Sequence, residues 1–441
     1  MASTNAAQPA ERSDGLTLNK SVEVMSYSFS CLGVLLCALF SVTVQAGALY
    51  FYEMSNASES SYGGVGMTAR ANDSGTVFTN PAGMTRFDDS AMLAGGVGVY
   101  IDGGFQTNGQ NTATGPSGSV NKRVVPAGSF SYLRPLNDQW TAGISVHNYF
   151  GLAVDWPGDW VGRKTSVNVA LLAPQIQPTL AYEVNDWLSV GAGAAVTMGY
   201  MSEKLRPEAL TPGDYPDGKV RISDTAWAVQ GNFGIMLQPW DHTRIGIRYL
   251  TETDLDFEDD PQTSWRDPVG KAIGDPKVNL DLGVTMPQAL NIGVHHRWDD
   301  RLNLLASAGW DEISEFGRIE VGIDGNGRPG TTVNADFRDV WNFGVGAEYQ
   351  WKPKLQLTAG IAMETSMSSS RTRSLAIPLG SLYRYAIGFK QQRDGGIFGG
   401  GLTGLYEGNL PIEDKPGIGG EVNGKYSNVS LYIFSLYWTW D

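Results

Sequence analysis

The segment Leu188-Ser-Val-Gly-Ala-Gly-Ala-Ala-Val-Thr-Met-Gly-Tyr200 alternates between apolar residues and small or polar ones at nearly every position. Because successive side chains of a β-strand point to opposite faces, a period of two predicts a strand with one apolar face. The same pattern returns at residues 140–150, 229–237, 355–363 and 383–389, where Arg384 falls on the small, polar face. These repeats predict an all-β protein.

Short and long connections alternate along the rest of the chain. The predicted tight turns are Asn137-Asp138, Asn185-Asp186, Asp241-His242, Asp299-Asp300, Lys352-Pro353 and Arg393-Asp394. The longer polar segments are residues 102–123, 151–164, 202–222, 254–277, 314–335, 367–379 and 409–426. Six turns and seven loops join fourteen strands, an even number, as in bacterial single-chain membrane barrels. A soluble sandwich, which buries its apolar face, is the less favoured alternative.

Tryptophans mark one end of the predicted strands. Each of the first five tight turns has a tryptophan within two residues: Trp140, Trp187, Trp240, Trp298 and Trp351. Such a ring is typical of the aromatic girdle at a membrane interface. The last strand has Tyr432, Phe434, Leu436, Trp438 and Trp440 on one face, and Asp441 follows. This ending resembles the aromatic C-terminus that the barrel-assembly machinery recognises. We therefore predict a 14-stranded antiparallel transmembrane β-barrel.

The N-terminus predicts export. Lys20 precedes an apolar run at residues 31–44, and Val44-Gln45-Ala46 has the small-x-small pattern of a signal-peptide cleavage site. We expect residues 1–46 to be a signal peptide, with Met1 or Met25 as the start. The two cysteines of the chain fall inside this leader, so no disulfide is expected after cleavage. The net charge of −14 argues against nucleic-acid binding.

Between the leader and the first strand lies Ala71-Asn-Asp-Ser-Gly-Thr-Val-Phe-Thr-Asn-Pro-Ala-Gly-Met84. Asn80-Pro81 and Gly83 disfavour a regular helix or a central strand there. Irregular backbone at membrane depth must be surrounded by protein. We interpret residues 47–89 as a hatch inside the lumen and residues 90–441 as the barrel. The alternative is an ordinary turn before the first strand.

The sequence offers little for catalysis. It has four histidines, of which His295 and His296 are adjacent on a predicted strand and therefore face opposite sides. Residues 158–165 resemble a phosphate-binding loop only weakly, and Asp324-Gly-Asn-Gly lacks the ligand pattern of a calcium loop. We expect no enzyme activity, no cofactor and no metal site, and His147 is the one catalytic candidate to test.

Several short motifs occur in the order in which they are found in one family. They are Ala71-Asn-Asp, Asn80-Pro-Ala-Gly-Met84, Pro135-Leu-Asn-Asp-Gln-Trp140, Asn148-Tyr-Phe-Gly-Leu-Ala153, Trp160-Val-Gly-Arg163, Ile247-Arg-Tyr249, Met286-Pro287, Ala308-Gly-Trp310, Phe337-Arg-Asp339 and Ala376-Ile-Pro378. Over essentially the whole mature chain, the sequence resembles the FadL/TodX-type outer-membrane transporters of long-chain fatty acids and aromatic hydrocarbons.

The resemblance implies a monomeric barrel in the Gram-negative outer membrane that takes up a hydrophobic small molecule passively and releases it sideways through a gap in the wall. The implied hatch motif is Asn80, Pro81, Ala82 and Gly83, lying against an inward kink in the third strand. That strand, residues 139–153, includes the lateral-exit candidates Gly143, Asn148, Tyr149 and Gly151. Leu49, Tyr50 and Phe51 would line the substrate pocket. Outer-membrane lipids, lipopolysaccharide and the barrel-assembly machinery would be the other partners.

The sequence leaves two questions open. The cargo could be a fatty acid, an aromatic hydrocarbon or another lipophile, and the short third loop at residues 201–222 argues against an outer fatty-acid groove. A general diffusion porin or an adhesin-like barrel is the alternative function. A porin needs an open lumen, whereas about forty residues lie between the predicted leader and the first predicted strand here.

Overall fold

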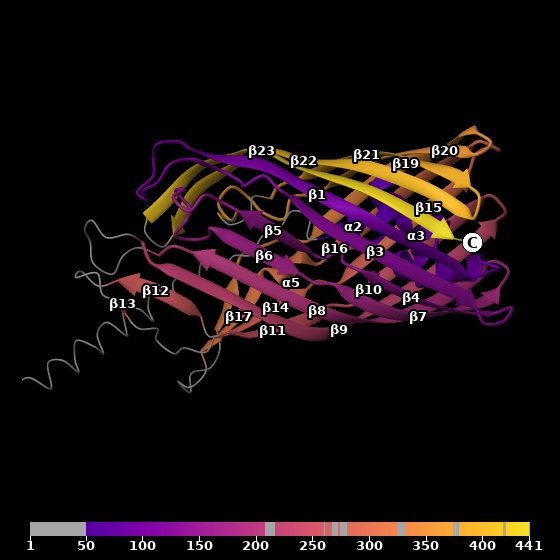
Figure 1. The fold of residues 1–441 in the computed structure, drawn as a ribbon, viewed down its shortest axis with the longest axis horizontal. Coiled ribbons are helices and arrows are strands. Elements are labelled where there is room, and N and C mark those ends of the chain that lie inside the picture. Colours follow the sequence, from indigo (N-terminus) through magenta and orange to yellow (C-terminus); the bar gives the residue numbers. More distant parts are fainter. Residues whose placement is uncertain are drawn as a thin grey trace, which may run out of the picture.

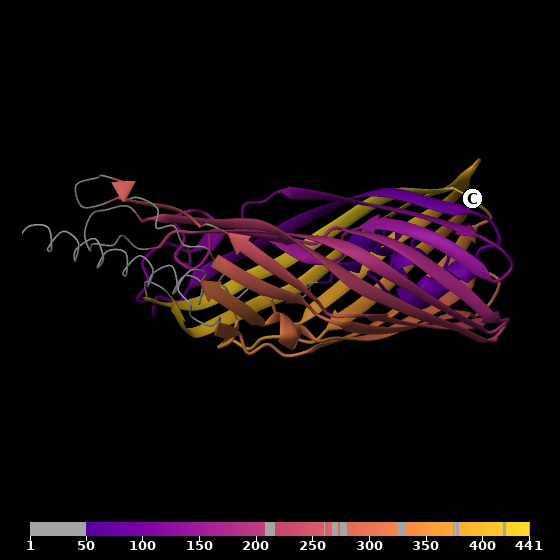
Figure 2. The same ribbon diagram turned by 90° about the horizontal axis from the view of Figure 1, so that it is seen from below.

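The computed structural model describes residues 50–207, 217–259, 261–266, 272–273, 280–323, 331–373, 375, 379–417 and 420–440. In this part of the chain, the strands wind into one elongated barrel with short helices inside it (Figures 1 and 2). The predicted signal peptide (residues 1–46), Leu49 and the motif at residues 376–378 lie outside the described residues, as does the turn at residues 324–330. No helix in the described ranges is long and apolar enough to cross a membrane.

The strands are β1 (Ala91–Thr107), β2 (Gly118–Ser119), β3 (Val124–Pro135), β4 (Trp140–His147), β5 (Gly151–Asp155), β6 (Asn168–Leu172), β7 (Gln175–Asn185), β8 (Leu188–Leu205), β9 (Lys219–Trp240), β10 (Thr243–Leu250), β11 (Thr253–Asp259), β12 (Gln262–Arg266), β13 (Ala272–Ile273), β14 (Leu280–Met286), β15 (Ala289–Arg297), β16 (Leu302–Asp311), β17 (Arg318–Ile323), β18 (Thr331–Asn334), β19 (Val340–Lys352), β20 (Leu355–Glu364), β21 (Leu382–Arg393), β22 (Gly396–Gly417) and β23 (Gly420–Trp440). The helices are α2 (Tyr52–Ser55), η1 (Ala57–Ser61), α3 (Met67–Arg70), α4 (Thr76–Thr79), η2 (Pro81–Arg86) and α5 (Ile313–Phe316).

The barrel is closed and antiparallel. Six of the barrel strands are interrupted, and each of these consists of two consecutive elements that follow one course along the wall: β4 and β5, β6 and β7, β10 and β11, β14 and β15, β16 and β17, and β18 and β19. Over the described ranges this gives fourteen barrel strands, as the alternation of turns and loops predicted. The first and last strands close the barrel, pairing from Met92 with Trp440 to Thr107 with Gly424.

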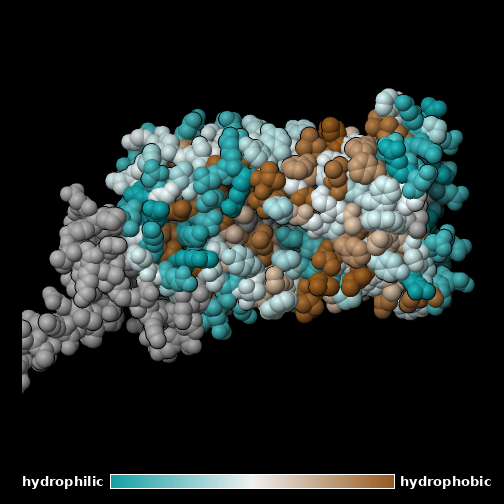
Figure 3. Space-filling model, in the orientation of Figure 1, coloured by the Kyte–Doolittle hydropathy of each residue, from teal (hydrophilic) through white to brown (hydrophobic). Residues whose placement is uncertain are grey.

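The lipid-facing wall follows the alternation in the sequence. A band of hydrophobic side chains crosses the barrel between two hydrophilic ends (Figure 3). The five predicted girdle tryptophans are all exposed, from 42% for Trp140 to 66% for Trp240 and Trp298. All six predicted tight turns are confirmed, since a strand ends just before each turn or at its first residue and the next begins just after it.

The predicted loops are shorter than expected. Residues 409–426, for example, are mostly the continuing ends of β22 and β23, and residues 202–205 and 219–222 extend β8 and β9. Beyond the membrane both faces of a strand can be polar, so the alternation fades while the backbone hydrogen bonds continue. Hydropathy alone therefore placed the strand ends too early.

The N-terminal helices fill the lumen as a hatch (Figure 1). Wall glycines allow the hatch backbone to approach closely. A Cβ built on Gly246 of β10 would lie 1.8 Å from the carbonyl oxygen of Thr68, and one on Gly360 of β20 would lie 2.0 Å from that of Tyr62. Such distances are far inside van der Waals contact, so the inward glycines of the alternating strands are what lets the hatch fit.

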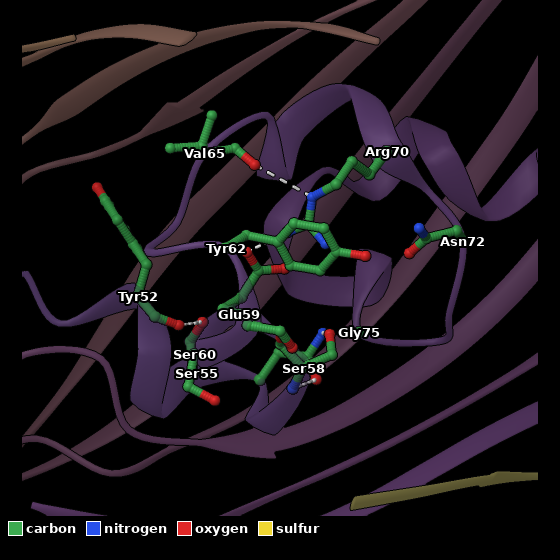
Figure 4. Close-up of polar contacts among 12 residues, drawn as sticks. Tyr52, Ser55, Ser58, Glu59, Ser60, Tyr62, Val65, Arg70, Asn72 and Gly75 are labelled. Carbon is green, nitrogen blue, oxygen red and sulfur yellow. Dashed lines mark hydrogen bonds and ion pairs between the residues drawn. The ribbon is translucent and has the colours of Figure 1, made fainter. Parts of the chain in front are cut away.

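Buried charges hold the hatch together and to the wall. Figure 4 shows Arg70 beside Tyr62, with its Nε donating to the carbonyl of Val65 at 3.2 Å. The guanidinium lies 3.7 Å from the ring centroid of Tyr62 and forms an ion pair with Glu59. Burial lowers the pKa of Arg70 and Glu59 raises it; the net shift is upward, so Arg70 keeps its charge.

Glu348 of β19 links this hatch cluster to the barrel. Its Oε1 accepts hydrogen bonds from the Tyr62 hydroxyl at 2.7 Å and from Asn72 Nδ2 at 2.9 Å. Its Oε2 accepts one from Asn303 Nδ2 at 2.9 Å. One wall carboxylate therefore fixes two hatch side chains that lie ten positions apart.

We expect Glu348→Ala to loosen the hatch without unfolding the barrel. The buried Tyr62 hydroxyl would lose its acceptor, at a cost of about 1–3 kcal/mol, while the strand ladders stay intact. Conductance of the purified protein in planar bilayers should rise, and heat-modifiable mobility on gels should persist. Glu252→Ala, at an exposed position, is the control. Equal conductance of wild type and Glu348→Ala would show that Glu348 does not hold the hatch.

Candidate functional site

The hydrogen-bonded wall is interrupted between β3 and the course of β4 and β5. Pairing of β3 with β4 runs from Pro135 opposite Thr141 to Phe130 opposite Val146, where it stops. Beyond it, residues 124–129 of β3 pair with β1, and β5 pairs with β6. In the described part of the chain, no pairing joins β5 to β3, so the wall has a break beside residues 148–151.

Gly151 makes this break possible. Its φ is +138°, a conformation that residues with a side chain rarely adopt. A Cβ built there would lie 2.2 Å from the carbonyl oxygen of Leu171 on β6. The strand can thus leave β3 and resume pairing with β6 only because position 151 has no side chain.

Hatch residues cover the break from inside. The backbone N–H of Phe51 donates to the carbonyl of Tyr149 at 2.7 Å, and Tyr50 forms a β-bridge with Phe150. The ring of Phe78 lies 4.9 Å from that of Tyr149, measured between centroids. The interrupted backbone therefore finds its polar partner in the hatch, and its aromatic side chains are buried against the hatch.

An apolar cavity of about 340 Å³ lies at the break. It is bounded by the hatch, by β1, β3 and β5, and by the outer part of β23. Its lining includes Phe51, Met54, Val99, Ile101, Pro126, Ala127, Asn148, Gly151, Val154, Trp156, Leu172, Leu379, Val429 and Leu431. Pockets of this size and character are typical binding sites for hydrophobic small molecules.

Stacked indoles close one side of the cavity. Trp156 lines it and lies parallel to Trp160, with 4.4 Å between ring centroids. Trp160 Nε1 donates to the carbonyl of Ser166 at 2.9 Å, which holds residues 158–165 as a series of turns. This segment, with its weak phosphate-loop pattern, supports an aromatic wall instead.

A groove on the outer surface of the wall adjoins the cavity. It is lined by Ala94, Gly95, Gly96, Gly128, Ser129, Phe130, Val146, Phe398, Leu436, Tyr437 and Trp438. Gly128 and Val146 line both this groove and the cavity. The lipid-facing surface is hollowed where the strand pairing ends, and Gly128 and Val146 lie between this hollow and the cavity.

Comparison with known proteins identifies the family. A profile of the family described as outer membrane protein transport protein (OMPP1/FadL/TodX) matches residues 37–394. The chain belongs to this family.

Curated members of the OMPP1/FadL/TodX family align with most of the chain. The long-chain fatty acid transport protein of Escherichia coli is 25% identical over 351 residues, covering 72% of this chain and 77% of that protein. Outer membrane protein P1 of Haemophilus influenzae is 27% identical over 370 residues, covering 73% and 79%.

Solved structures share the fold. A FadL homologue of Pseudomonas aeruginosa superposes with a TM-score of 0.76 at 20% identity, covering 89% of this chain and all of that one. The toluene transporter TbuX of Ralstonia pickettii superposes with a TM-score of 0.64 at 17% identity, covering 88% and 98%.

The residues that the family resemblance suggested fall into three groups. Phe51, Asn148 and Gly151 line the cavity. Tyr50 and Tyr149 stack behind it, with 5.4 Å between ring centroids. Gly143 lies away from the cavity, where an added Cβ would be 2.7 Å from Met84 Sδ of the hatch.

The hatch motif has close contacts with β8 and β9. Asn80 Nδ2 donates to the carbonyl of Ile235 on β9 at 3.1 Å, and a Cβ on Gly191 of β8 would lie 2.5 Å from Pro81 C. Gly83 belongs to the same packed turn, as its Cβ would meet Thr76 Oγ1 at 2.2 Å. Other hatch residues contact the kinked strand: the ring centroid of Phe78 is 4.1 Å from that of His147, and Met84 lies against Gly143.

Most of the cavity lining was missed in the sequence. Met54, Pro126, Ala127 and Leu431 are remote in sequence, and only the closed barrel brings them together. Alternation could have assigned Ala127 and Leu431 to inward faces, but register decides which inward residues meet.

We expect Gly151→Ala to disrupt the break. The new methyl group would collide with the Leu171 carbonyl and strain the backbone, which typically costs about 1–3 kcal/mol. Gly395→Ala is the control, because Gly395 also has a positive φ of +83° but nothing within 4 Å of an added Cβ. Urea unfolding in detergent should show a larger loss for Gly151→Ala. Equal losses would contradict a steric requirement for glycine at the break.

Proposed function

We propose that this protein takes up hydrophobic compounds across the outer membrane and releases them sideways through the break in its wall. The observation that carries the proposal is that the apolar cavity and the lipid-facing groove share Gly128 and Val146 in their linings, which marks a path between them. A lipophile could move from cavity to bilayer along this path without contact with water. No energy source is needed, since partition into lipid is favourable for apolar cargo.

The cavity has the size and surface for such a cargo. A dry cavity of about 150 Å³ holds benzene in an engineered protein, so a volume of about 340 Å³ accommodates a substituted aromatic or a medium-length chain. Burial of each methylene contributes about 0.8 kcal/mol. The walls can therefore hold a lipophile by contact area alone.

Relatives with transport functions support the same conclusion. The Escherichia coli relative is named a long-chain fatty acid transport protein, and TbuX is described as a toluene transporter. Members of the family are transporters and not enzymes. The filled lumen argues against the alternative of a general diffusion porin, which conducts through an open channel.

The proposal also includes the surroundings of the barrel. We assign residues 47–89 to the hatch and residues 90–441 to a barrel that acts as a monomer in the Gram-negative outer membrane. The exposed aromatic face of β23, which includes Tyr432, Phe434 and Trp440, supports recognition by the barrel-assembly machinery. Lipopolysaccharide would surround the outer end, where the hydrophilic rim lies.

Filling the cavity tests the function. Ala127 lines the cavity, so we expect Ala127→Trp to block uptake of labelled toluene and oleate by a Gram-negative host that lacks its own transporters. Ala192→Trp is the control, because it adds the same side chain to the exposed, lipid-facing side of β8. Both variants should keep heat-modifiable mobility. Uptake by Ala127→Trp equal to that of Ala192→Trp would show that cargo does not pass through the cavity, and wild-type uptake of a hydrophilic sugar alone would indicate a porin.

A further inference from the structure

The charged side chains in the cavity lining limit the kind of cargo that it can bind. Among the described residues that line it there is no lysine or arginine, and the one charged group is the carboxylate of Asp102. Lys122 Nζ contacts this carboxylate at 3.0 Å, but it does so from an exposed position. A cargo carboxylate would thus enter an apolar site whose described lining has no cation and whose one carboxylate already holds Lys122, which is unfavourable.

Two buried arginines near the break make their contacts outside the cavity, although Arg248 Nε has no hydrogen-bond partner in the described residues. Arg384 is paired with Glu53 at 3.1 Å and with Glu364. Arg248 donates to Asn291 Oδ1 at 2.9 Å, and its guanidinium lies 4.8 Å from the ring centroid of Tyr52. Neither arginine lines the cavity, so neither is placed to bind an anionic cargo there.

Asn148 is the lining residue with an unused polar atom. Its Oδ1 is buried and has no hydrogen-bond partner in the described structure. By contrast, the neighbouring His147 uses both ring nitrogens, contacting Ser145 Oγ at 3.1 Å and Gln175 Oε1 at 3.1 Å. A buried amide oxygen without a donor is costly, and a ligand that supplies the donor removes that cost.

We propose that Asn148 is the polar contact of the cargo site, and that the cavity prefers neutral lipophiles bearing one hydroxyl group, such as alkylphenols, over carboxylates and bare hydrocarbons. This inference rests on the proposed function. A hydroxyl group both donates and accepts, so it satisfies the Asn148 amide in either orientation of its oxygen and nitrogen. The apolar remainder of the cargo would lie against Phe51, Val154 and Trp156.

A matched set of compounds separates the possibilities. We would measure uptake of labelled 4-butylphenol, butylbenzene and 4-butylbenzoate at pH 7.5, where the benzoate is ionised, and subtract uptake by cells with empty vector. The three share a ring and chain and differ in one substituent. One net hydrogen bond predicts that wild-type uptake at limiting concentration favours the phenol by roughly three- to tenfold.

Asn148→Leu, which keeps the approximate size of the side chain but removes its polar atoms, should abolish this preference. Asn108→Leu, at an exposed position away from the cavity, is the control and should keep the preference. Heat-modifiable mobility would show that Asn148→Leu is folded. If that variant does not fold, Asn148→Ala takes its place, and the wild-type ranking is a test by itself.

Each outcome decides one of the two proposals. Uptake of the benzoate equal to or above that of the phenol overturns the inference and leaves hydrophobic transport intact. An unchanged phenol preference in Asn148→Leu overturns the role of Asn148. Uptake of none of the three compounds above the vector background overturns the proposed function itself.

Discussion

A bilayer offers no water to an unpaired backbone group, so every break in a membrane barrel must be satisfied by the protein itself. In this structure, hatch residues inside the lumen contact the backbone at the break beside β5. The N–H of Phe51 bonds to the Tyr149 carbonyl, and Tyr50 bridges to Phe150. The first described residues of the hatch thus take the place of β3, which does not pair with the chain beside β5. The break in the wall and the filled lumen therefore belong together, because the hatch supplies the backbone contacts that the wall lacks at the break.

The remaining hatch contacts explain how so polar a segment stays in one orientation. Glu53 and Glu364 flank Arg384, and Arg384 also donates to the Tyr50 carbonyl at 3.1 Å. Buried ion pairs add little net stability over apolar packing, but breaking one is strongly unfavourable. Any rotation or shift of the hatch would separate these charges. The ion pairs thus specify where the hatch sits, while the wall glycines make room for it.

The architecture could be predicted from the sequence because every strand of a lipid-facing barrel repeats the same alternation of apolar residues with small or polar ones. The alternation in residues 188–200, the tight turns and the girdle tryptophans such as Trp187 were enough to predict fourteen strands. Sequence reasoning failed where tertiary register decides. The motif at Asn80-Pro81 was identified as hatch, but its contacts with β8 and β9 depend on how the helices turn inside the lumen. Likewise Ala127 and Leu431 have ordinary inward positions, and nothing local marks them as neighbours of Asn148.

The polarity of the lumen below the cavity gives a physical reason for a sideways exit. Gln177 Nε2 donates to the Val77 carbonyl at 2.9 Å, and Asn232 Nδ2 donates to the Phe78 carbonyl at 2.8 Å. An apolar cargo moving past the hatch would have to replace such buried hydrogen bonds with contacts that return none, which costs free energy at each step. At the break, the same cargo meets Gly128 and Val146, which offer only backbone and hydrocarbon. The route of least cost for a lipophile therefore turns toward the bilayer, and a hydrophilic solute gains nothing from it.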